Sequence, residues 1–457
     1  MVRDPFSILP CEITSEIFVH CLPTSYTTRE WNTANPHEAP TLLLHVCRIW
    51  REIAIGTPAL WAKMELSMHN AHRHDTARAW LKRAKACPLS VKLYHWARGE
   101  RVGEDTCEDT LSDEEAGDFF TWFISPFQTF LAHAHNLVFL ELSTIPWEYI
   151  YELDQLPDSC NFPSLQKLTV GVEEGLDVVS DWDDMDDTPC VRLFANAPLL
   201  CEISLIDGTP PVFLGSLPWH QLTKYTGTPS YLYHSIDALR LGSNLVECAV
   251  AVGGINTDFV EILIHPNLKS LTLFKDRWCS TDIFQFLTLP ALETLRILDC
   301  KYEWFEHEEF LDFLTRSSAP LRQFTIRLDP HTALDIGVFL SMPGLVELEI
   351  WNPHEIFLTL FFSHFEDVTV LPQLQHLSFF HPRHSSEDVA SKQLEKVQAG
   401  LTARWNSRRH APAQMKSFSL VWHEDIGDFP EDILAPFRTM TSEGLDISLK
   451  TPTRSYI

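Results

Sequence analysis

The sequence predicts an α/β protein in which a small all-helical N-terminal segment precedes a solenoid of alternating helices and strands, with the strands forming a curved parallel sheet. Two observations carry this prediction. Apolar residues at helical spacing fill residues 8–66. From about residue 127 a phrase of the form Leu-x-x-apolar-x-apolar recurs, usually after a proline. Its last two apolar positions are two residues apart, as one face of a short strand requires.

Residues 8–66 have the pattern of two or three short helices. Pro10 stands where a first helical turn tolerates proline, and Pro58 marks the end of the later helix. The apolar positions at helical spacing are Ile13, Ile17 and Phe18 in the first helix and Val46, Trp50 and Ile53 in the second. So few helices bury too little apolar surface to be securely stable alone, and we expect a partner or a neighbouring domain to complete them.

This segment, taken as residues 1–66, resembles the F-box. The family pattern runs Leu-Pro, Glu-Ile, Ile-Phe, Val-Cys-Arg-x-Trp-Arg and Leu-Trp. The matching residues here are Leu9-Pro10, Glu12-Ile13, Ile17-Phe18, Val46-Cys47-Arg48-Ile49-Trp50-Arg51 and Leu60-Trp61. The motif is present in order and covers about an eighth of the chain. One departure from the family is an inserted polar loop at residues 24–40, whose length is tolerable on entropic grounds.

The resemblance implies that the segment binds a Skp-type adaptor, which links it to a cullin. It assigns the adaptor interface to Leu9, Pro10, Ile13, Ile17, Phe18, Leu44, Val46 and Trp50. Trp61 is expected to anchor the helices to the rest of the protein. The function that follows from the resemblance is that of a substrate-receptor subunit of an SCF-type ubiquitin ligase.

Residues 67–126 connect the helical segment to the repeats. Asp75–Cys87 has the pattern of a helix, and Pro88–Leu93 that of a strand able to start the sheet. The stretch Glu100–Asp118 contains nine acidic residues, and a second stretch, Glu173–Asp187, contains eight. We interpret both as solvated loops or insertions, with docking of a basic partner as the less favoured alternative.

Residues 127–457 contain eleven copies of the recurring phrase. They centre on Leu137, Leu165, Leu200, Leu222, Leu245, Leu268, Leu292, Leu321, Leu345, Leu374 and Met415. Helical phrases that start with aspartate precede three of the prolines, at Asp258–Leu263, Asp282–Leu287 and Asp335–Leu340. Most neighbouring copies are 22 to 29 residues apart, which is close to the range of leucine-rich repeats, and such units must stack to bury their apolar faces.

This half resembles the irregular leucine-rich-repeat regions that follow many F-boxes. The Asn or Cys of the regular repeat is mostly absent, since only Cys300 fits, and we therefore expect uneven curvature. A compact α/β domain is the rival assignment. Aromatic residues directly after the strands can reach the rim of the sheet and anchor a protein substrate. These candidates are Phe274, Trp278, Trp351, Phe380 and Trp422, with Trp351 as first choice.

Composition narrows the class of partner. The net charge of −27 disfavours binding to nucleic acid and to anionic membranes. No apolar run approaches the roughly 18 residues of a membrane helix. The eleven cysteines are scattered and form no C-x-x-C pair, which favours an intracellular protein, cytoplasmic or nuclear.

No motif for a cofactor, a metal or a catalytic nucleophile is found in the sequence, so we expect a protein that is not an enzyme. Two alternatives stay open. One is a repeat scaffold that binds the adaptor without directing ubiquitination. The other is an enzyme whose site has no recognisable motif, which would show as a deep polar pocket with converging polar side chains.

Overall fold

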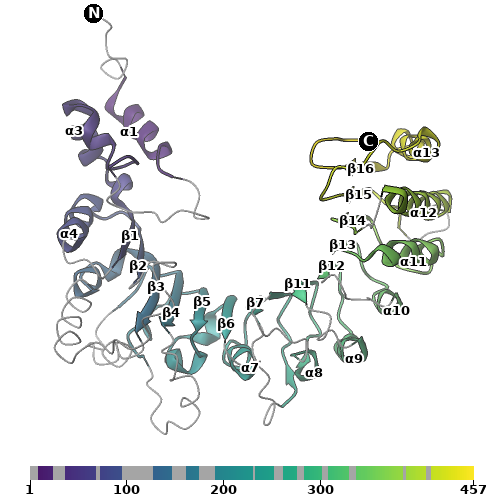
Figure 1. Ribbon diagram of the computed structural model, residues 1–457. Coiled ribbons are helices and arrows are strands. Elements are labelled where there is room, and N and C mark those ends of the chain that lie inside the picture. Colours follow the sequence, from purple (N-terminus) through teal and green to yellow (C-terminus); the bar gives the residue numbers. More distant parts are fainter. Residues whose placement is uncertain are drawn as a thin grey trace, which may run out of the picture. The chain divides into compact units, whose positions relative to one another are not determined.

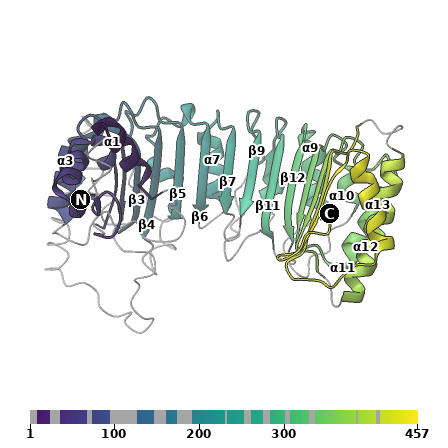
Figure 2. The same ribbon diagram turned by 90° about the horizontal axis from the view of Figure 1, so that it is seen from above.

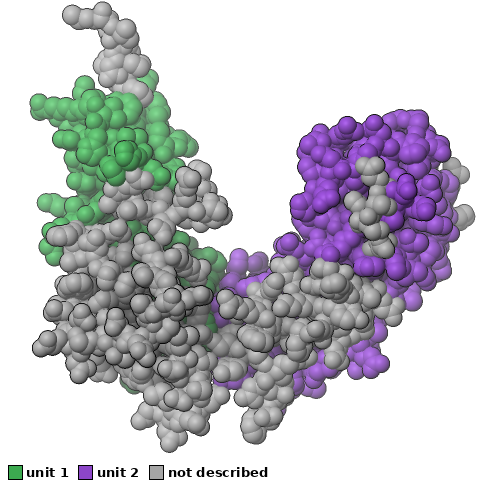
Figure 3. All heavy atoms as spheres, viewed as in Figure 1, with its two compact units in different colours: residues 1–222 green, residues 223–457 purple. Residues whose placement is uncertain are grey.

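The computed structural model describes thirteen segments of the chain. They are residues 9–23, 36–67, 73–94, 127–146, 161–173, 191–229, 232–251, 261–274, 283–300, 307–328, 336–383, 387–407 and 413–457. The chain forms two compact units, residues 1–222 (unit 1) and 223–457 (unit 2), which Figure 3 distinguishes by colour. Both units are mixed α/β with a parallel sheet, as the sequence predicts for the class. The acidic stretch 100–118, Trp278 and nearly all of the stretch 173–187 lie outside the described residues.

Unit 1 begins with short helices. They are α1 (Cys11–His20), α2 (Leu43–Val46), α3 (Arg48–Gly56), the 3₁₀ turn η2 (Pro58–Trp61) and, after one strand, α4 (Arg73–Ala84). Helix α1 starts behind Pro10, whose carbonyl oxygen accepts a hydrogen bond from the Thr14 amide at 3.1 Å. The Cys47 sulfur accepts the Trp50 amide at the start of α3. Helix α4 ends before the predicted Cys87, because the chain turns at Lys85 with a left-handed φ of 54°.

The sheet of unit 1 consists of parallel strands in sequence order (Figure 1). They are β1 (Lys63–Ser67), β2 (Leu89–Tyr94), β3 (Leu137–Pro146), β4 (Lys167–Glu173) and β5 (Glu202–Gly208). Further 3₁₀ turns are η3 (Ala134–Asn136), η5 (Pro211–Leu214) and η6 (Trp219–Gln221). Strand β1 corrects the boundary drawn at residue 66, since Met64 and Leu66 are buried and β1 pairs with β2. The sheet therefore begins inside the segment that the sequence analysis assigned to helices alone.

The sheet of unit 2 is also parallel, and Figure 2 shows β7, β9, β11 and β12 side by side. Its strands are β6 (Lys224–Pro229), β7 (Glu247–Ala251), β9 (Ser270–Phe274), β11 (Thr294–Cys300), β12 (Gln323–Leu328), β13 (Glu347–Trp351), β14 (His376–Phe380), β15 (Ser417–Val421) and β16 (Asp446–Lys450). The helices are α7 (Leu232–Leu241), α8 (Ile283–Phe286), α9 (His307–Ser317), α10 (Gly337–Leu340), α11 (Glu355–Phe365), α12 (Glu387–Asn406) and α13 (Glu431–Ser442). Figure 1 shows α9 to α13 on one side of these strands.

The recurring phrase locates its strands correctly. All eleven residues on which it centres are buried, and each lies at or just before the start of a strand from β3 to β15. Strand β16 was missed: Leu445 is 1% exposed, but the buried Ile447 and Leu449 follow it by two and four residues, one residue fewer than in the phrase, and no proline introduces it. The phrase reports burial of one strand face, and this burial does not depend on the proline.

Two of the predicted helical phrases are shorter than expected. Only Ile283–Phe286 and Gly337–Leu340 are helical there, and the three aspartates that begin the phrases lie outside the described residues. Part of the difference is a small second sheet, in which β8 (Leu263–Ile264) pairs with β10 (Leu287–Thr288). Each strand ends a phrase that was predicted as helix. Ladder hydrogen bonds between distant segments decide this outcome, and a local period cannot report them.

Helix packing in unit 2 leaves no room for a side chain at Gly400. A Cβ on this α12 residue would come within 2.6 Å of the Phe362 carbonyl oxygen on α11. Because that oxygen belongs to the backbone of a packed helix, α11 and α12 would have to separate. We expect Gly400→Ala to lower the free energy of unfolding by about 1–3 kcal/mol, measured by chemical denaturation.

The matched control is Gly56→Ala at the end of α3, where a new Cβ meets nothing within 4 Å. This change should be neutral or stabilise by up to about 1 kcal/mol. Equal losses for the two variants would contradict the close approach of α11 and α12.

Within the described residues, no helix is both long and apolar enough to cross a membrane.

Candidate functional site

Helix α1 carries apolar side chains on two faces. Thr14 and Phe18 are buried, whereas Leu9, Ile13 and Ile17 are between 36% and 50% exposed. Ile13 and Ile17 are four residues apart, so they share one side of the helix, and Leu9 precedes the N-cap residue Pro10; Phe18 is turned from Ile17 by about 100°. The buried face packs inside unit 1, and the other face is open to a partner.

The exposed apolar residues continue onto the next two helices. Leu42, Val46 and Ile49 are 41% to 50% exposed. Together with Leu9, Ile13 and Ile17 they form what we call the N-terminal apolar patch. Leu44 and Trp50 are half-buried and Pro10 is exposed. Of the eight residues assigned to the adaptor interface, five are therefore exposed and two are partly accessible.

The structure corrects the assignment of Phe18 to the adaptor interface. This side chain is 1% exposed and lies against the Trp50 ring, with the two ring centroids 4.9 Å apart. It therefore holds α1 against α3 and is not offered to another chain. The motif places Phe18 next to Ile17 in the sequence, but only the packing of α1 on α3 shows that Phe18 is buried while Ile17 is exposed.

Trp61 connects the helical segment to helix α4 of unit 1. It is fully buried, and its indole Nε1 donates to the Ala54 carbonyl oxygen of α3 at 2.8 Å. On its other side it meets α4: the Trp80 ring packs edge-on at 4.9 Å, and the Arg83 guanidinium lies 4.4 Å from the ring centroid. These contacts give Trp61 the anchoring role that the sequence analysis expected.

A second surface of interest is the exposed face of the unit 2 sheet. Side chains alternate along each strand, so every second residue is buried against the helices. The residues at the first, third and fifth positions form three rows across β12 to β16, which we call the first, third and last rows. The first row is Gln323, Glu347, His376, Ser417 and Asp446. The third is Thr325, Glu349, Ser378, Ser419 and Ser448. The last is Arg327, Trp351, Phe380, Val421 and Lys450.

Two rings in the last row form an aromatic platform, Trp351 and Phe380. The rings are stacked, with centroids 4.3 Å apart and planes 18° from parallel. The Arg327 guanidinium lies 5.9 Å from the Trp351 centroid, within the range of a cation–π contact. The Trp351 indole donates to the Glu349 carboxylate. Both rings are partly exposed, so the platform is accessible from the open side of the sheet.

Two histidines border the platform. The His381 ring meets Trp351 edge-on at 5.3 Å and lies 5.1 Å from the His423 ring. Burial lowers the pKa of His381, and the charges of His423 and Arg327 lower it further. The sequence analysis missed Arg327, His381 and His423. Arg327 follows the repeat residue Leu321 by six residues, as Trp351 follows Leu345, so the recurring phrase held a signal that pairs them.

The five substrate-binding candidates separate in the structure. Trp351 and Phe380 lie together, whereas Phe274 is on β9, with β11 and β12 between it and β13. Trp422 corrects the prediction, since it is 2% exposed and packs on Phe429 with centroids 5.5 Å apart. It follows the half-buried Val421 on the open face directly, so strand alternation turns it toward the interior. Trp278 lies outside the described residues.

In the described part of the chain, no group of three His, Cys, Asp or Glu side chains is placed to hold a metal ion. A scan against protein-family models finds no match for the chain, and a search of curated proteins finds none either. The N-terminal apolar patch and the aromatic platform are thus identified by their geometry and by the sequence motifs alone.

Proposed function

We propose that this chain is a substrate-receptor subunit of an SCF-type ubiquitin ligase. In this proposal the N-terminal helices are an F-box that binds a Skp-type adaptor and, through it, a cullin. The repeats are a leucine-rich-repeat-like solenoid that binds the protein to be ubiquitinated. The protein acts inside the cell, in cytoplasm or nucleus, needs no cofactor and has no catalytic residue of its own.

The observation that carries the proposal is the exposure of the N-terminal apolar patch. Its six leucine, isoleucine and valine side chains lie at motif positions or beside them and remain 36% to 50% exposed, although the same helices bury Phe18. Exposed apolar side chains that gather on adjoining helices mark sites of protein–protein contact. A stable partner interface buries about 1,600 Å² in total, and a few apolar anchors supply most of its energy.

A receptor of this kind needs only two binding surfaces. Holding substrate and ubiquitin-carrying enzyme in one assembly raises the effective concentration of one near the other. The N-terminal apolar patch provides the first surface, and the open face of the unit 2 sheet provides the second. A scaffold that binds the adaptor without ubiquitination would use the same first surface, and turnover of a bound substrate would distinguish the two roles.

The test is co-purification with a Skp-type adaptor and a cullin. Replacing Leu9 and Pro10 by alanine should weaken adaptor capture at least tenfold, about 1.4 kcal/mol, because two exposed apolar contacts are lost. The carbonyl of residue 10 that accepts the Thr14 amide is retained, so α1 should persist. Adaptor affinity is measured by titration against the immobilised chain, and helix content by circular dichroism.

The matched control is Leu199→Ala, which removes a leucine that is 55% exposed, against 40% for Leu9, from another part of unit 1. Its adaptor affinity should equal that of the unaltered chain. Unchanged capture by the Leu9 and Pro10 double variant, with its helices intact, would refute the proposed adaptor interface.

A further inference from the structure

The last row of the unit 2 sheet differs in kind from the rows beside it. The first row carries the acids Glu347 and Asp446, and the third is mostly hydroxyl-bearing. The last row has two exposed cations, Arg327 and Lys450, at its ends and the aromatic platform between them. In a chain with a net charge of −27, this is a local cationic and aromatic surface.

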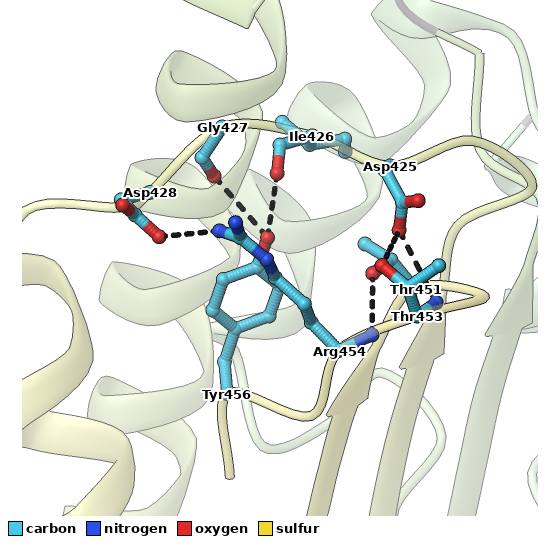
Figure 4. A network of polar contacts seen from close by, with 8 residues as sticks. All are labelled: Asp425, Ile426, Gly427, Asp428, Thr451, Thr453, Arg454 and Tyr456. Atoms are coloured by element: carbon cyan, nitrogen blue, oxygen red, sulfur yellow. Dashed lines mark hydrogen bonds and ion pairs between the residues drawn. The ribbon is translucent and has the colours of Figure 1, made fainter.

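Neighbouring carboxylates are engaged with other groups. Glu349 accepts from the Trp351 indole. In the loop after β15, Asp425 accepts from the Thr453 amide and hydroxyl, and Asp428 pairs with Arg454 at 2.7 Å (Figure 4). These contacts tie the acids to the C-terminal tail, where the Tyr456 hydroxyl also donates to the Ile426 carbonyl at 2.8 Å.

The backbone beside the platform is held in an uncommon conformation. Asn352 and His381, which directly follow Trp351 and Phe380, have φ values of 54° and 53°. The Asn352 amide donates to the Phe380 carbonyl at 2.8 Å, and the His381 amide to the Val421 carbonyl. Left-handed non-glycine residues cost free energy and cluster at binding sites. Here they accompany the placement of the His381 ring against the edge of Trp351.

We propose that this surface binds an acidic peptide segment of a partner protein. An apolar or aromatic side chain of the peptide rests on the Trp351–Phe380 platform, and flanking carboxylates pair with Arg327 and Lys450. Four strand spacings separate these two cations, about 19 Å, which an extended peptide of about six residues spans. The inference rests on the proposed function only in taking the peptide as part of the substrate.

Protonation of His381 should strengthen binding of the acidic peptide. Among the described residues, the charges that act on His381 are those of His423 after β15 and Arg327 on β12, and the Trp351 ring that His381 meets donates to Glu349 on β13. A bound carboxylate offsets the repulsion among the cations and raises the lowered pKa of His381, so binding takes up a proton. Affinity should therefore rise as the pH falls from about 7.5 to about 5.5, where glutamate stays mostly ionised.

The experiment uses the full chain and fluorescein-labelled synthetic nonapeptides, read by fluorescence anisotropy. The acidic peptide has phenylalanine at its centre and two glutamates on each side, and companion peptides replace the glutamates by glutamine or by lysine. We expect the acidic peptide to bind at least tenfold more tightly than either companion. Arg327→Glu should abolish most of this preference, and replacing His381 and His423 by glutamine should remove the pH dependence.

The matched control is Arg296→Glu, the same charge reversal at an exposed arginine of β11, on the third row of the same sheet face. It should change affinity less than twofold. Equal binding of all peptides, tighter binding of the lysine peptide, or equal losses for both charge reversals would overturn the inference. Binding that requires phosphoserine beside the phenylalanine would also reject carboxylates as the ligand. Because adaptor capture is measured separately, these outcomes leave the proposed adaptor interface unaffected.

Discussion

Ile13→Asp is expected to reduce adaptor binding at least a hundredfold, about 2.7 kcal/mol. Ile13 is 50% exposed and shares one face of α1 with Ile17. In the free chain an aspartate there remains in water, so the fold should persist. In a complex the carboxylate would be buried without a partner, and this desolvation is costly.

Adaptor affinity is measured by titration calorimetry, with the thermal midpoint of the free chain as a check on folding. The control is Ile356→Asp on α11, where an isoleucine is similarly exposed, at 57%, in unit 2. It should bind the adaptor as the unaltered chain does. If Ile13→Asp keeps full affinity while it is folded, the N-terminal apolar patch is not the adaptor-binding surface.

Trp61→Ala is expected to lower the free energy of unfolding by about 3–5 kcal/mol, the range for loss of a large buried aromatic side chain. The change empties the space between α3 and α4 and leaves the Ala54 carbonyl without the indole donor. The Arg83 guanidinium also loses the ring that it lies over. The helices that present the N-terminal apolar patch should therefore detach from the sheet, and adaptor binding should weaken with them.

Limited proteolysis and chemical denaturation measure this effect, because cleavage within α1 to α3 reports local detachment. Trp351→Ala serves as control: it removes the same side chain from a half-exposed position in unit 2 and should cost clearly less stability. Adaptor binding should be unaffected by it. If Trp61→Ala were as mild as Trp351→Ala, the anchoring role of Trp61 would have to be abandoned.

Local patterns predicted much of the fold. The leucine phrase locates β3 to β15 because burial of one strand face leaves a two-residue period, whatever the strand pairs with. The phrase does not predict strands whose formation depends on pairing with a distant segment. Leu263 and Leu287 lie in helical patterns but form the paired strands β8 and β10, and Met64 and Leu66 are buried in the five-residue strand β1, where the phrase is absent.

The candidate sites show the same division. The motif assigns Leu9, Ile13 and Val46 to the adaptor interface by residue type. It assigns Phe18 to the same interface, although Phe18 is buried against Trp50. Trp422 was predicted at the surface with the other aromatics and lies in the interior. In each case the side chain is apolar, and only its neighbours decide whether it meets water.

The amino-acid sequence by itself determines the α/β class, the positions of the strands that follow the recurring phrase and the apolar motif of residues 8–66, because periodicity and residue type are local properties. The tertiary structure alone decides which apolar side chains stay exposed and which side chains meet across strands. Arg327, Trp351 and Phe380 are about 25 to 30 residues apart along the chain and become neighbours only through strand register. That register follows from hydrogen bonding and packing between distant segments, which no short stretch of sequence encodes.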